Sequence, residues 1–165
     1  MKDIFQFAIE FEQENQEFYR DCAENAENEK LQEVFLELAE EEEKHERIVR
    51  DLARDRSEEE VESDIVTDAR EAFQEIAADF ERDPSGALTA DQVDVYRQAQ
   101  ELERKSNSFY SEKSAETDDK RVAEAFKKLA REEKKHEEIL ENIIQMVDKP
   151  NTWLEDPEWY HLDEY

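Results

Sequence analysis

The chain has 165 residues, with 49 Asp or Glu against 22 Lys or Arg, and its formal net charge is −27 at pH 7. The length predicts one domain. A charged fraction of 43%, against about 25% in an ordinary domain, means that much of the chain must be solvated surface. The single glycine excludes glycine-rich phosphate loops, dinucleotide-binding fingerprints and most of the turns that all-β folds need. We therefore expect a mainly helical protein.

Cysteine content and charge limit the compartment and the partners. Cys22 is the one cysteine, so the chain cannot build a disulfide framework or a cysteine-rich metal site, and we interpret this residue as a small buried hydrophobe. Asp3, Gln6 and Glu10 interrupt any signal-peptide core, and no apolar stretch reaches the about 18 residues of a membrane span. The negative charge repels nucleic acid and anionic lipid and attracts cations. We expect a cytoplasmic protein without nucleic-acid or membrane partners.

The sequence contains an internal repeat at an offset of 91 residues. Residues 8–51 align without gaps with residues 99–142. The recurring residues of the first copy are Ala8, Glu10, Glu12, Phe18, Tyr19, Phe35, Leu38, Ala39, Glu41, Glu42, Lys44, His45, Glu46 and Ile48. Because each copy of an internal repeat folds as one supersecondary unit, the two halves should share the same supersecondary structure.

Each copy is typical of a hairpin of two antiparallel helices. The first hairpin is predicted over residues 3–56, with a short polar break at residues 27–29. The second is predicted over residues 89–148, starts at Thr89 with the capping-box pattern Thr-Ala-Asp-Gln, and breaks at residues 117–119. Short connections make the joined helices antiparallel neighbours, so two hairpins predict a bundle of four long helices.

A fifth helix is predicted between the hairpins, over about residues 64–82. Its apolar residues fall on one face, and Asp83-Pro84-Ser85-Gly86 should end it. A connection of this length favours a bundle with one long helical crossover between the second and third long helices. After Pro150 the helical pattern ends, and residues 149–165 form an aromatic tail that we expect to pack on the bundle or on a second subunit. The tail contains Trp153, Leu154, Trp159 and Tyr160.

Helical phase separates one glutamate of the second helix from its many neighbours. At 100° per residue, Glu42 lies in the centre of the apolar stripe, whereas Glu41 and Glu43 lie about 100° to either side. The stripe consists of Leu31, Phe35, Leu38, Val49 and Ala53. His45 follows three residues later, on the next turn and about 60° away. Glu42 and His45 are therefore predicted to point into the same core.

The other three long helices repeat this feature. Glu133 and His136 follow the same pattern on the fourth long helix, while Glu12 and Glu103 lie among apolar and aromatic residues on the first and third. Four carboxylates without buried partners would cost several kcal/mol each, and no Lys or Arg lies in phase with them. Bound divalent cations resolve this cost. One Glu from each of two helices plus Glu-x-x-His from each of two others is the ligand set of ferritin-like di-iron or di-manganese proteins, and oxygen and imidazole ligands suit both metals.

On these motifs the chain resembles the rubrerythrin-like branch of the ferritin-like superfamily. The matching segments are Ala8-Ile9-Glu10-Phe11-Glu12, Phe18-Tyr19, Phe35-x-x-Leu38-Ala39-x-x-Glu42-x-x-His45, and their second-copy counterparts ending in Glu133-x-x-His136. The resemblance implies two iron ions, or alternatively two manganese ions, held by Glu12, Glu42, His45, Glu103, Glu133 and His136. It also implies that Glu42 and Glu133 bridge the ions, and that Tyr19 and Tyr110 donate hydrogen bonds to ligand carboxylates. Alternatively, the two tyrosines are ordinary residues at the edge of the core.

The resemblance implies an all-α ferritin-like fold and a redox protein that reduces peroxide or dioxygen in oxidative-stress defence, with an external electron donor. A homo-oligomer, with a dimer favoured, is also expected. Rubrerythrins additionally carry a rubredoxin-like domain, which one cysteine cannot support, and a further Glu where this chain has Ser106. Two alternatives stay open: a ferroxidase or iron-handling protein without peroxidase turnover, and a metal-free helical interaction module. A third Glu-x-x-His, at Glu158 and His161, lies outside any apolar stripe, and we do not expect it to bind metal.

Overall fold

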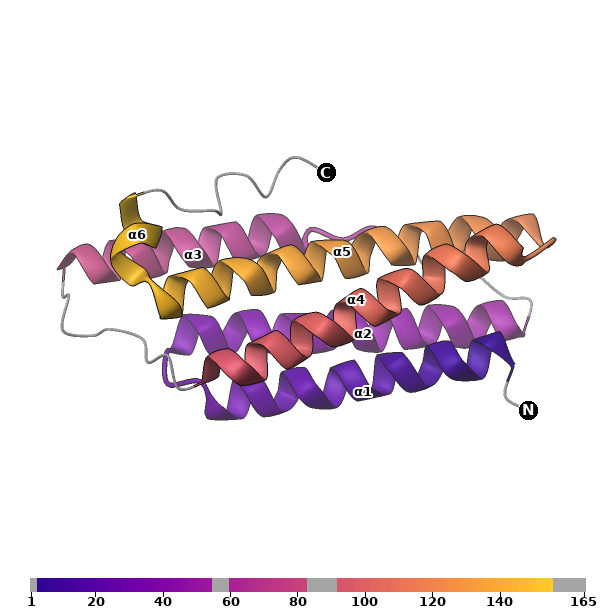
Figure 1. Ribbon diagram of the computed structural model, residues 1–165, viewed down its shortest axis with the longest axis horizontal. Helices are drawn as coiled ribbons and strands as arrows, with labels where there is room; N and C mark the ends of the chain where they lie inside the picture. The colour runs from indigo at the N-terminus through magenta and orange to yellow at the C-terminus, as the bar shows by residue number, and fades with distance from the viewer. Residues whose placement is uncertain (1–2, 55–59, 83–91, 156–165) are drawn as a thin grey trace.

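The computed structural model describes residues 3–54, 60–82 and 92–155. Across these residues the ordered elements are all helices, and the all-α prediction is confirmed (Figure 1). The helices are α1 (Ile4–Asn25), α2 (Glu29–Ala53), α3 (Ile65–Arg82), α4 (Val93–Glu116), α5 (Lys120–Asp148) and α6 (Pro150–Glu155). Four of them, α1, α2, α4 and α5, are the long helices that the repeat predicts.

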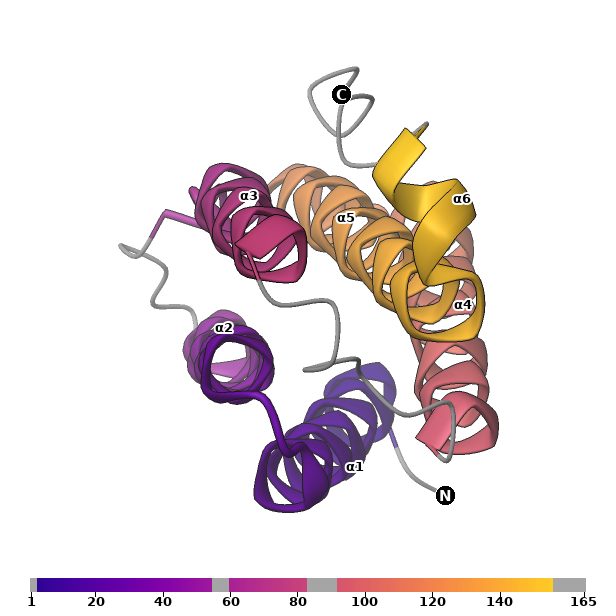
Figure 2. The ribbon, with the colours of Figure 1, turned by 90° about the vertical axis from the view of Figure 1, so that its left-hand side faces the viewer.

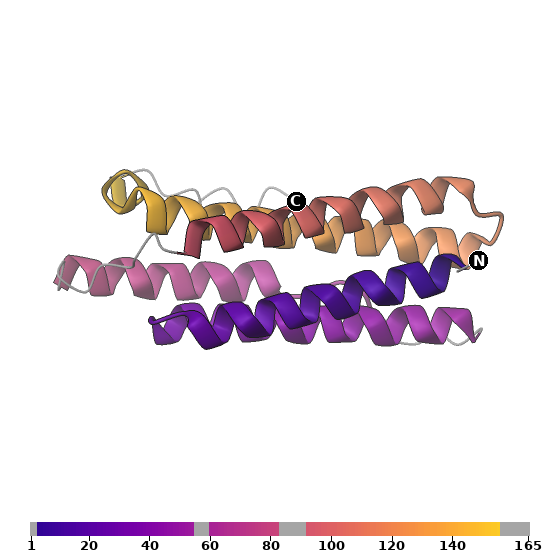
Figure 3. The same ribbon diagram turned by 60° about the horizontal axis from the view of Figure 1, so that its bottom comes forward.

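The long helices form two hairpins that pack against each other. Helices α1 and α2 make one pair and α4 and α5 the other, with further contacts between α1 and α4 (Figures 1 and 2). Helix α3 runs alongside this bundle between α2 and α5, as the crossover from one hairpin to the other requires (Figure 2). Figure 3 shows the hairpin of α1 and α2 lying lengthwise beside α4. The four-helix bundle with one long helical crossover is therefore confirmed.

The two hairpin turns have the same construction. The side chain of Asn28 accepts hydrogen bonds from the backbone N–H groups of residues 30 and 31 at the start of α2. Asp119, the equivalent residue of the second copy, accepts from residues 121 and 122 at the start of α5. Each cap satisfies N–H groups that have no partner inside the helix, which explains why both polar breaks lie where the sequence predicts them.

The helix boundaries agree with the prediction to within a few residues. Helix α2 ends at Ala53 rather than at residue 56, and α3 begins at Ile65. Helix α4 is described from Val93, so the capping box expected at Thr89 and the stop at residues 83–86 lie outside the described residues.

The prediction that the helical pattern ends after Pro150 is wrong. Helix α6 begins at Pro150 itself, because proline is tolerated in a first turn where its missing N–H needs no partner. The Trp153 ring is buried and meets Phe73 of α3 edge to face, with the ring centroids 6.3 Å apart. This part of the tail therefore packs on the bundle. Trp159 and Tyr160 lie outside the described residues.

Two apolar clusters fill the two ends of the bundle. Phe35 and Tyr19 belong to one cluster, together with the buried face of α3 and Trp153. Phe126 and Tyr110, their equivalents in the second copy, belong to the other. Each fully buried side chain of this size stabilises the fold by about 1.5–3 kcal/mol relative to an exposed one. In all four long helices the residues between these clusters are buried and polar, so the middle of the bundle holds a polar layer.

Helices α2 and α3 meet at a pair of carboxyl groups, Glu37 and Asp68. Burial, a hydrogen bond with Asp68 and the charges of Asp68, Glu41 and Glu40 raise the pKa of Glu37 from 4.5 to about 8. The folded protein therefore holds a proton that the unfolded chain releases above its own pKa. The stability that this proton contributes is present in full at low pH and is lost as the pH rises from 4.5 through about 8.

We expect Glu37→Gln to increase the free energy of unfolding at about pH 8.5 by about 1 kcal/mol, after allowance for the solvent that screens this half-exposed group. The substitution should also flatten the stability profile between about pH 5 and 8. Urea denaturation at several pH values measures both effects. Glu40→Gln, at an exposed neighbour, is the control. An unchanged profile in Glu37→Gln would contradict the assignment.

Candidate metal centre

The structure brings all six predicted ligand residues together in the polar layer. They are Glu12 of α1, Glu42 and His45 of α2, Glu103 of α4, and Glu133 and His136 of α5. Each of the six has an exposed fraction of 0%. Neighbouring glutamates such as Glu43 are exposed, so helical phase selected the buried carboxylates correctly.

The six residues form two overlapping groups, each with ligand atoms within 4.8 Å of one another. One group contains Glu12, Glu42, His45 and Glu133, and the other contains Glu42, Glu103, Glu133 and His136. Glu42 and Glu133 belong to both groups. These two residues therefore occupy the shared positions that a pair of bridging carboxylates requires.

The histidines face the carboxylates of the opposite repeat. His45 Nδ1 lies 3.0 Å from Glu133 Oε1, and His136 Nδ1 lies 2.7 Å from Glu42 Oε1. The two imidazole rings are parallel, with their centroids 5.5 Å apart and an interplanar angle of 3°. In both rings Nδ1 is thus the nitrogen that faces the carboxylate cluster.

The two predicted tyrosines also contact the opposite repeat. The Tyr110 hydroxyl donates a hydrogen bond to Glu12 Oε1 at 2.6 Å, and the Tyr19 hydroxyl donates to Glu103 Oε1. Both tyrosines are buried. The two hydrogen bonds therefore join α1 and α4, because each helix supplies one tyrosine donor and one glutamate acceptor.

The geometry agrees with a comparison against family models. The Rubrerythrin model matches residues 3–144, which include α1 to α4 and most of α5. The chain belongs to the rubrerythrin family. Its fold is accordingly the all-α ferritin-like bundle that the motifs predict. Comparisons with curated proteins and with solved structures gave no significant match. Among the residues that the structure describes, no helix has the length and apolar character needed to cross a lipid bilayer.

The carboxylates of this rubrerythrin-family site divide into two electrostatic classes. Burial, together with the charges of the other glutamates, raises the pKa values of Glu42 and Glu133 well above 4.5. Burial acts the same way on Glu103, but hydrogen bonds with Glu133 and His136 outweigh it and lower the pKa to about 2. The pKa of Glu12 is also lowered, because hydrogen bonds with Glu42 and His45 and the charge of His45 outweigh its burial. Without metal, the two shared glutamates therefore hold protons more tightly than the two outer glutamates.

Histidine and tyrosine respond to the same negative charges. Burial lowers the pKa of His136, but the charge of Glu103 and a hydrogen bond to it raise the pKa by more. Burial and the carboxylate charges raise the pKa values of Tyr19 and Tyr110 well above 10, so both remain hydrogen-bond donors. The net effect is a buried site that is rich in negative charge and is surrounded by neutral donors.

The residues present fit a pair of divalent cations. Each of the six residues has one buried oxygen or nitrogen without a hydrogen-bond partner within the described part of the chain. Such atoms are rare in folded proteins, because each costs about 1–3 kcal/mol. Here they gather on four carboxylates and two imidazoles, which are the donor types that iron and manganese prefer. Metal coordination would use the carboxylate oxygens and remove most of this cost.

The site also contains a polar pair that the sequence reasoning did not identify. Asn15 Nδ2 donates to Ser106 Oγ at 3.3 Å, and both side chains are buried. The two residues are 91 positions apart, so they are equivalent in the repeat and meet each other across it. They lie one turn after Glu12 and Glu103, respectively. The gapless alignment of the two copies places Asn15 opposite Ser106. Because the two residue types differ, the alignment alone did not indicate a pair.

Glu132 is a buried carboxylate that phase analysis did not predict. Its carboxylate accepts hydrogen bonds from Ser63 N and Ser63 Oγ, at 3.0 and 3.1 Å, and from Lys135 Nζ at 3.1 Å. These donors anchor the segment before α3 to α5 and leave Glu132 outside both candidate metal groups. Glu158 and His161 lie outside the described residues.

Proposed function

We propose that this rubrerythrin-family protein is a non-haem di-iron or di-manganese carboxylate protein that reduces peroxide or dioxygen with electrons from an external donor. One observation carries the proposal: two groups of buried carboxylate and imidazole ligands share Glu42 and Glu133. In this assignment Glu12 and His45 complete one metal position, and Glu103 and His136 complete the other. Two divalent ions balance the four carboxylates in charge.

The chain's own side chains supply the environment for the reaction. When bound, the two metal ions supply the redox chemistry, with one electron from each ion towards the oxidant. The complete burial of the six ligand residues excludes bulk water and strengthens every electrostatic interaction in the site. Tyr19 and Tyr110 hold Glu103 and Glu12 in place through their hydroxyls and keep their own protons. This fixed geometry limits the escape of reactive oxygen species.

A ferroxidase or iron-handling function is the second candidate, and the net charge favours it. At −27, the surface concentrates cations such as Fe²⁺ from solution. The same ligands would then receive ferrous ions as substrate rather than hold them through many turnovers. The two functions differ in the fate of the metal after oxidation.

Elemental analysis of anaerobically purified protein, followed by stopped-flow absorbance with peroxide, tests the proposal. We expect two metal ions per chain, oxidation of both by one equivalent of peroxide, and repeated cycles when a reductant is added. Oxidation by dioxygen followed by release or deposition of ferric iron, without repeated cycles, would instead establish the ferroxidase. A chain that takes up no iron or manganese after reconstitution would overturn both functions.

Replacing Tyr110 with phenylalanine should weaken metal binding about 10- to 100-fold, because partners that orient ligands contribute this much to metal affinity. Tyr19→Phe should have a similar effect through Glu103. Competition with a chromophoric chelator measures the affinity, and circular dichroism checks the fold. Tyr96→Phe is the matched control, since this buried tyrosine packs against Phe35 and not against a ligand carboxylate. Equal affinity in all three variants would disprove this role for the hydroxyls.

A further inference from the structure

Helix α5 carries a concentration of positive charge that contrasts with the rest of the chain. The α5 basic stripe consists of Lys127, Lys128, Arg131, Lys134 and Lys135. These positions lie on the face of α5 opposite Glu133. The stripe contains five of the chain's 22 basic residues, whereas the chain as a whole has 49 acidic ones. Such an excess on one helix face calls for a specific explanation.

The internal repeat shows that the fold does not require this charge. The positions of α2 that are equivalent to the stripe are Leu36, Glu37, Glu40, Glu43 and Lys44. Both helices occupy corresponding places in the bundle and bury corresponding cores, yet one outer face is acidic and the other is basic. Packing of the core therefore does not account for the stripe.

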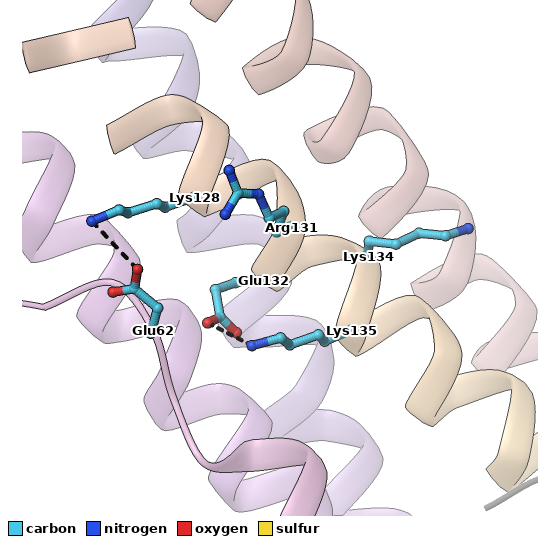
Figure 4. Close-up of a pocket in the computed structure, with 6 residues that line it drawn as sticks. All are labelled: Glu62, Lys128, Arg131, Glu132, Lys134 and Lys135. Atoms are coloured by element: carbon cyan, nitrogen blue, oxygen red, sulfur yellow. Dashed lines mark hydrogen bonds and ion pairs between the residues drawn. The ribbon is translucent and has the colours of Figure 1, made fainter. Parts of the chain in front are cut away.

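Three of the five residues of the stripe are exposed, and the charge of the stripe is only partly neutralised. Lys128 pairs with Glu62 at 3.3 Å, and Lys135 pairs with Glu132 at 3.1 Å (Figure 4). Lys134 pairs with two glutamates of its own helix, Glu137 at 3.3 Å and Glu138 at 3.4 Å. Lys127 and Arg131 are exposed, and neither has an ion pair within the part of the chain that the structure describes. Positive charge is thus available to a partner.

The surface is hollowed on both sides of the stripe. One pocket of about 320 Å³ lies between α5 and the segment before α3, and Arg131 and Lys134 line it together with Glu62 (Figure 4). A second pocket, of about 610 Å³, lies towards α4, and Arg131 and Lys134 line it as well, together with Lys127. The stripe is therefore a charged ridge between two recesses, a shape that can seat a protein surface.

We propose that the α5 basic stripe docks a small acidic electron-transfer protein. The inference rests on the proposed redox function, in which the chain needs an external donor. Glu133 and His136 project from the inner face of the same turns of α5 that carry the stripe. Because a helix with its side chains is about 10–12 Å across, a donor bound to the stripe would lie about one helix diameter from the metal ligands.

Charge and dimensions favour this occupant over two others. Two stripes facing each other across the axis of a symmetric dimer would repel, so the stripe does not pair with its own copy in this way. From Lys127 to Lys135 the stripe extends about 12 Å, which exceeds the size of one phosphate group. Elsewhere the chain repels an acidic partner, but at physiological salt that repulsion is screened beyond about 8 Å. An acidic protein is therefore steered towards this face.

The test compares two double variants of equal net charge. Lys127→Glu/Arg131→Glu reverses two unpaired residues of the stripe, and Arg97→Glu/Lys105→Glu reverses two exposed residues of α4 as the control. Both change the net charge from −27 to −31. The probe is a reduced plant-type ferredoxin, a small acidic [2Fe–2S] protein with a potential of about −400 mV. Two ferredoxins are oxidised, at one electron each, for each pair of ferric ions that is reduced.

We expect the stripe variant to lower the second-order rate constant of reduction by ferredoxin about tenfold at about 0.15 M salt, and the control to lower it less than twofold. Reduction by the methyl viologen cation radical should become faster in the stripe variant, because the surface is more negative. Equal losses in both double variants would show an effect of net charge only. An unchanged rate in the stripe variant would overturn the proposal.

Binding of oxidised ferredoxin, measured by interferometry on the protein as purified, tests docking separately from redox activity. We expect salt-sensitive binding that the stripe variant weakens about tenfold and the control does not. Because this measurement needs no bound metal, failure of the proposed function and failure of docking are distinguishable. Absence of binding, or saturable competition by inorganic phosphate at constant ionic strength, would overturn protein docking, and the second result would show a small-anion site instead.

Discussion

Glu42→Ala is expected to lower the metal content from two ions per chain to fewer than one, and Glu133→Ala is expected to do the same. Each residue belongs to both groups of candidate ligands, so its removal takes a carboxylate from both metal positions at once. The three remaining carboxylates also no longer balance two divalent ions in charge. Elemental analysis after reconstitution and desalting measures the result.

Two further variants make this prediction specific. Glu12 belongs to one group only, so Glu12→Ala should lose one ion and retain the other. Glu43→Ala removes the exposed neighbour of Glu42 and should retain both ions. Retention of two ions in Glu42→Ala would show that this residue does not bridge the metals. Loss of metal in Glu43→Ala would show that metal content responds to surface charge in general.

Removing the metal ions should lower the melting temperature by about 15 °C or more. A ligand present at 1,000 times its dissociation constant stabilises the folded state by about 4 kcal/mol per site, so two ions contribute about 8 kcal/mol. In a domain of 150–250 residues, 1 kcal/mol corresponds to about 2–4 °C. Differential scanning calorimetry with and without a strong chelator measures the change. A melting temperature that does not respond to the chelator would support the metal-free interaction module.

The effect of the chelator should also increase with pH. In the folded protein without metal, the pKa values of Glu42 and Glu133 are well above 4.5. Their protons are bound in the folded state and released on unfolding, so the stability contributed by these groups is lost as the pH rises through their folded pKa values. Protons also compete with metal at low pH. We therefore expect a larger difference between the two forms at about pH 8 than at about pH 6, and an equal difference would contradict these pKa directions.

The phase of each helix could be read from the sequence because it depends on local geometry. An α-helix turns 100° per residue wherever it lies, so the apolar stripe of α2 is sufficient to select Glu42 from a run of four glutamates. The turn residues Asn28 and Asp119 act within a few positions of themselves, which makes the breaks predictable for the same reason. Helix α6 was missed because burial of Trp153 against Phe73 stabilises a turn whose own sequence pattern is weak.

The sequence by itself thus determined the five longer helices, α1 to α5, their order, the crossover and the six residues that point inwards. Only the tertiary structure decided which of these residues meet. Tyr110 contacts Glu12 and not Glu103, which is nearer to it in the sequence. Contacts between helices depend on packing and on the register of one helix against another. The pairing of Asn15 with Ser106 and the hollows beside the α5 basic stripe have the same origin. Periodicity along one chain segment contains no information about the surface that packs against it.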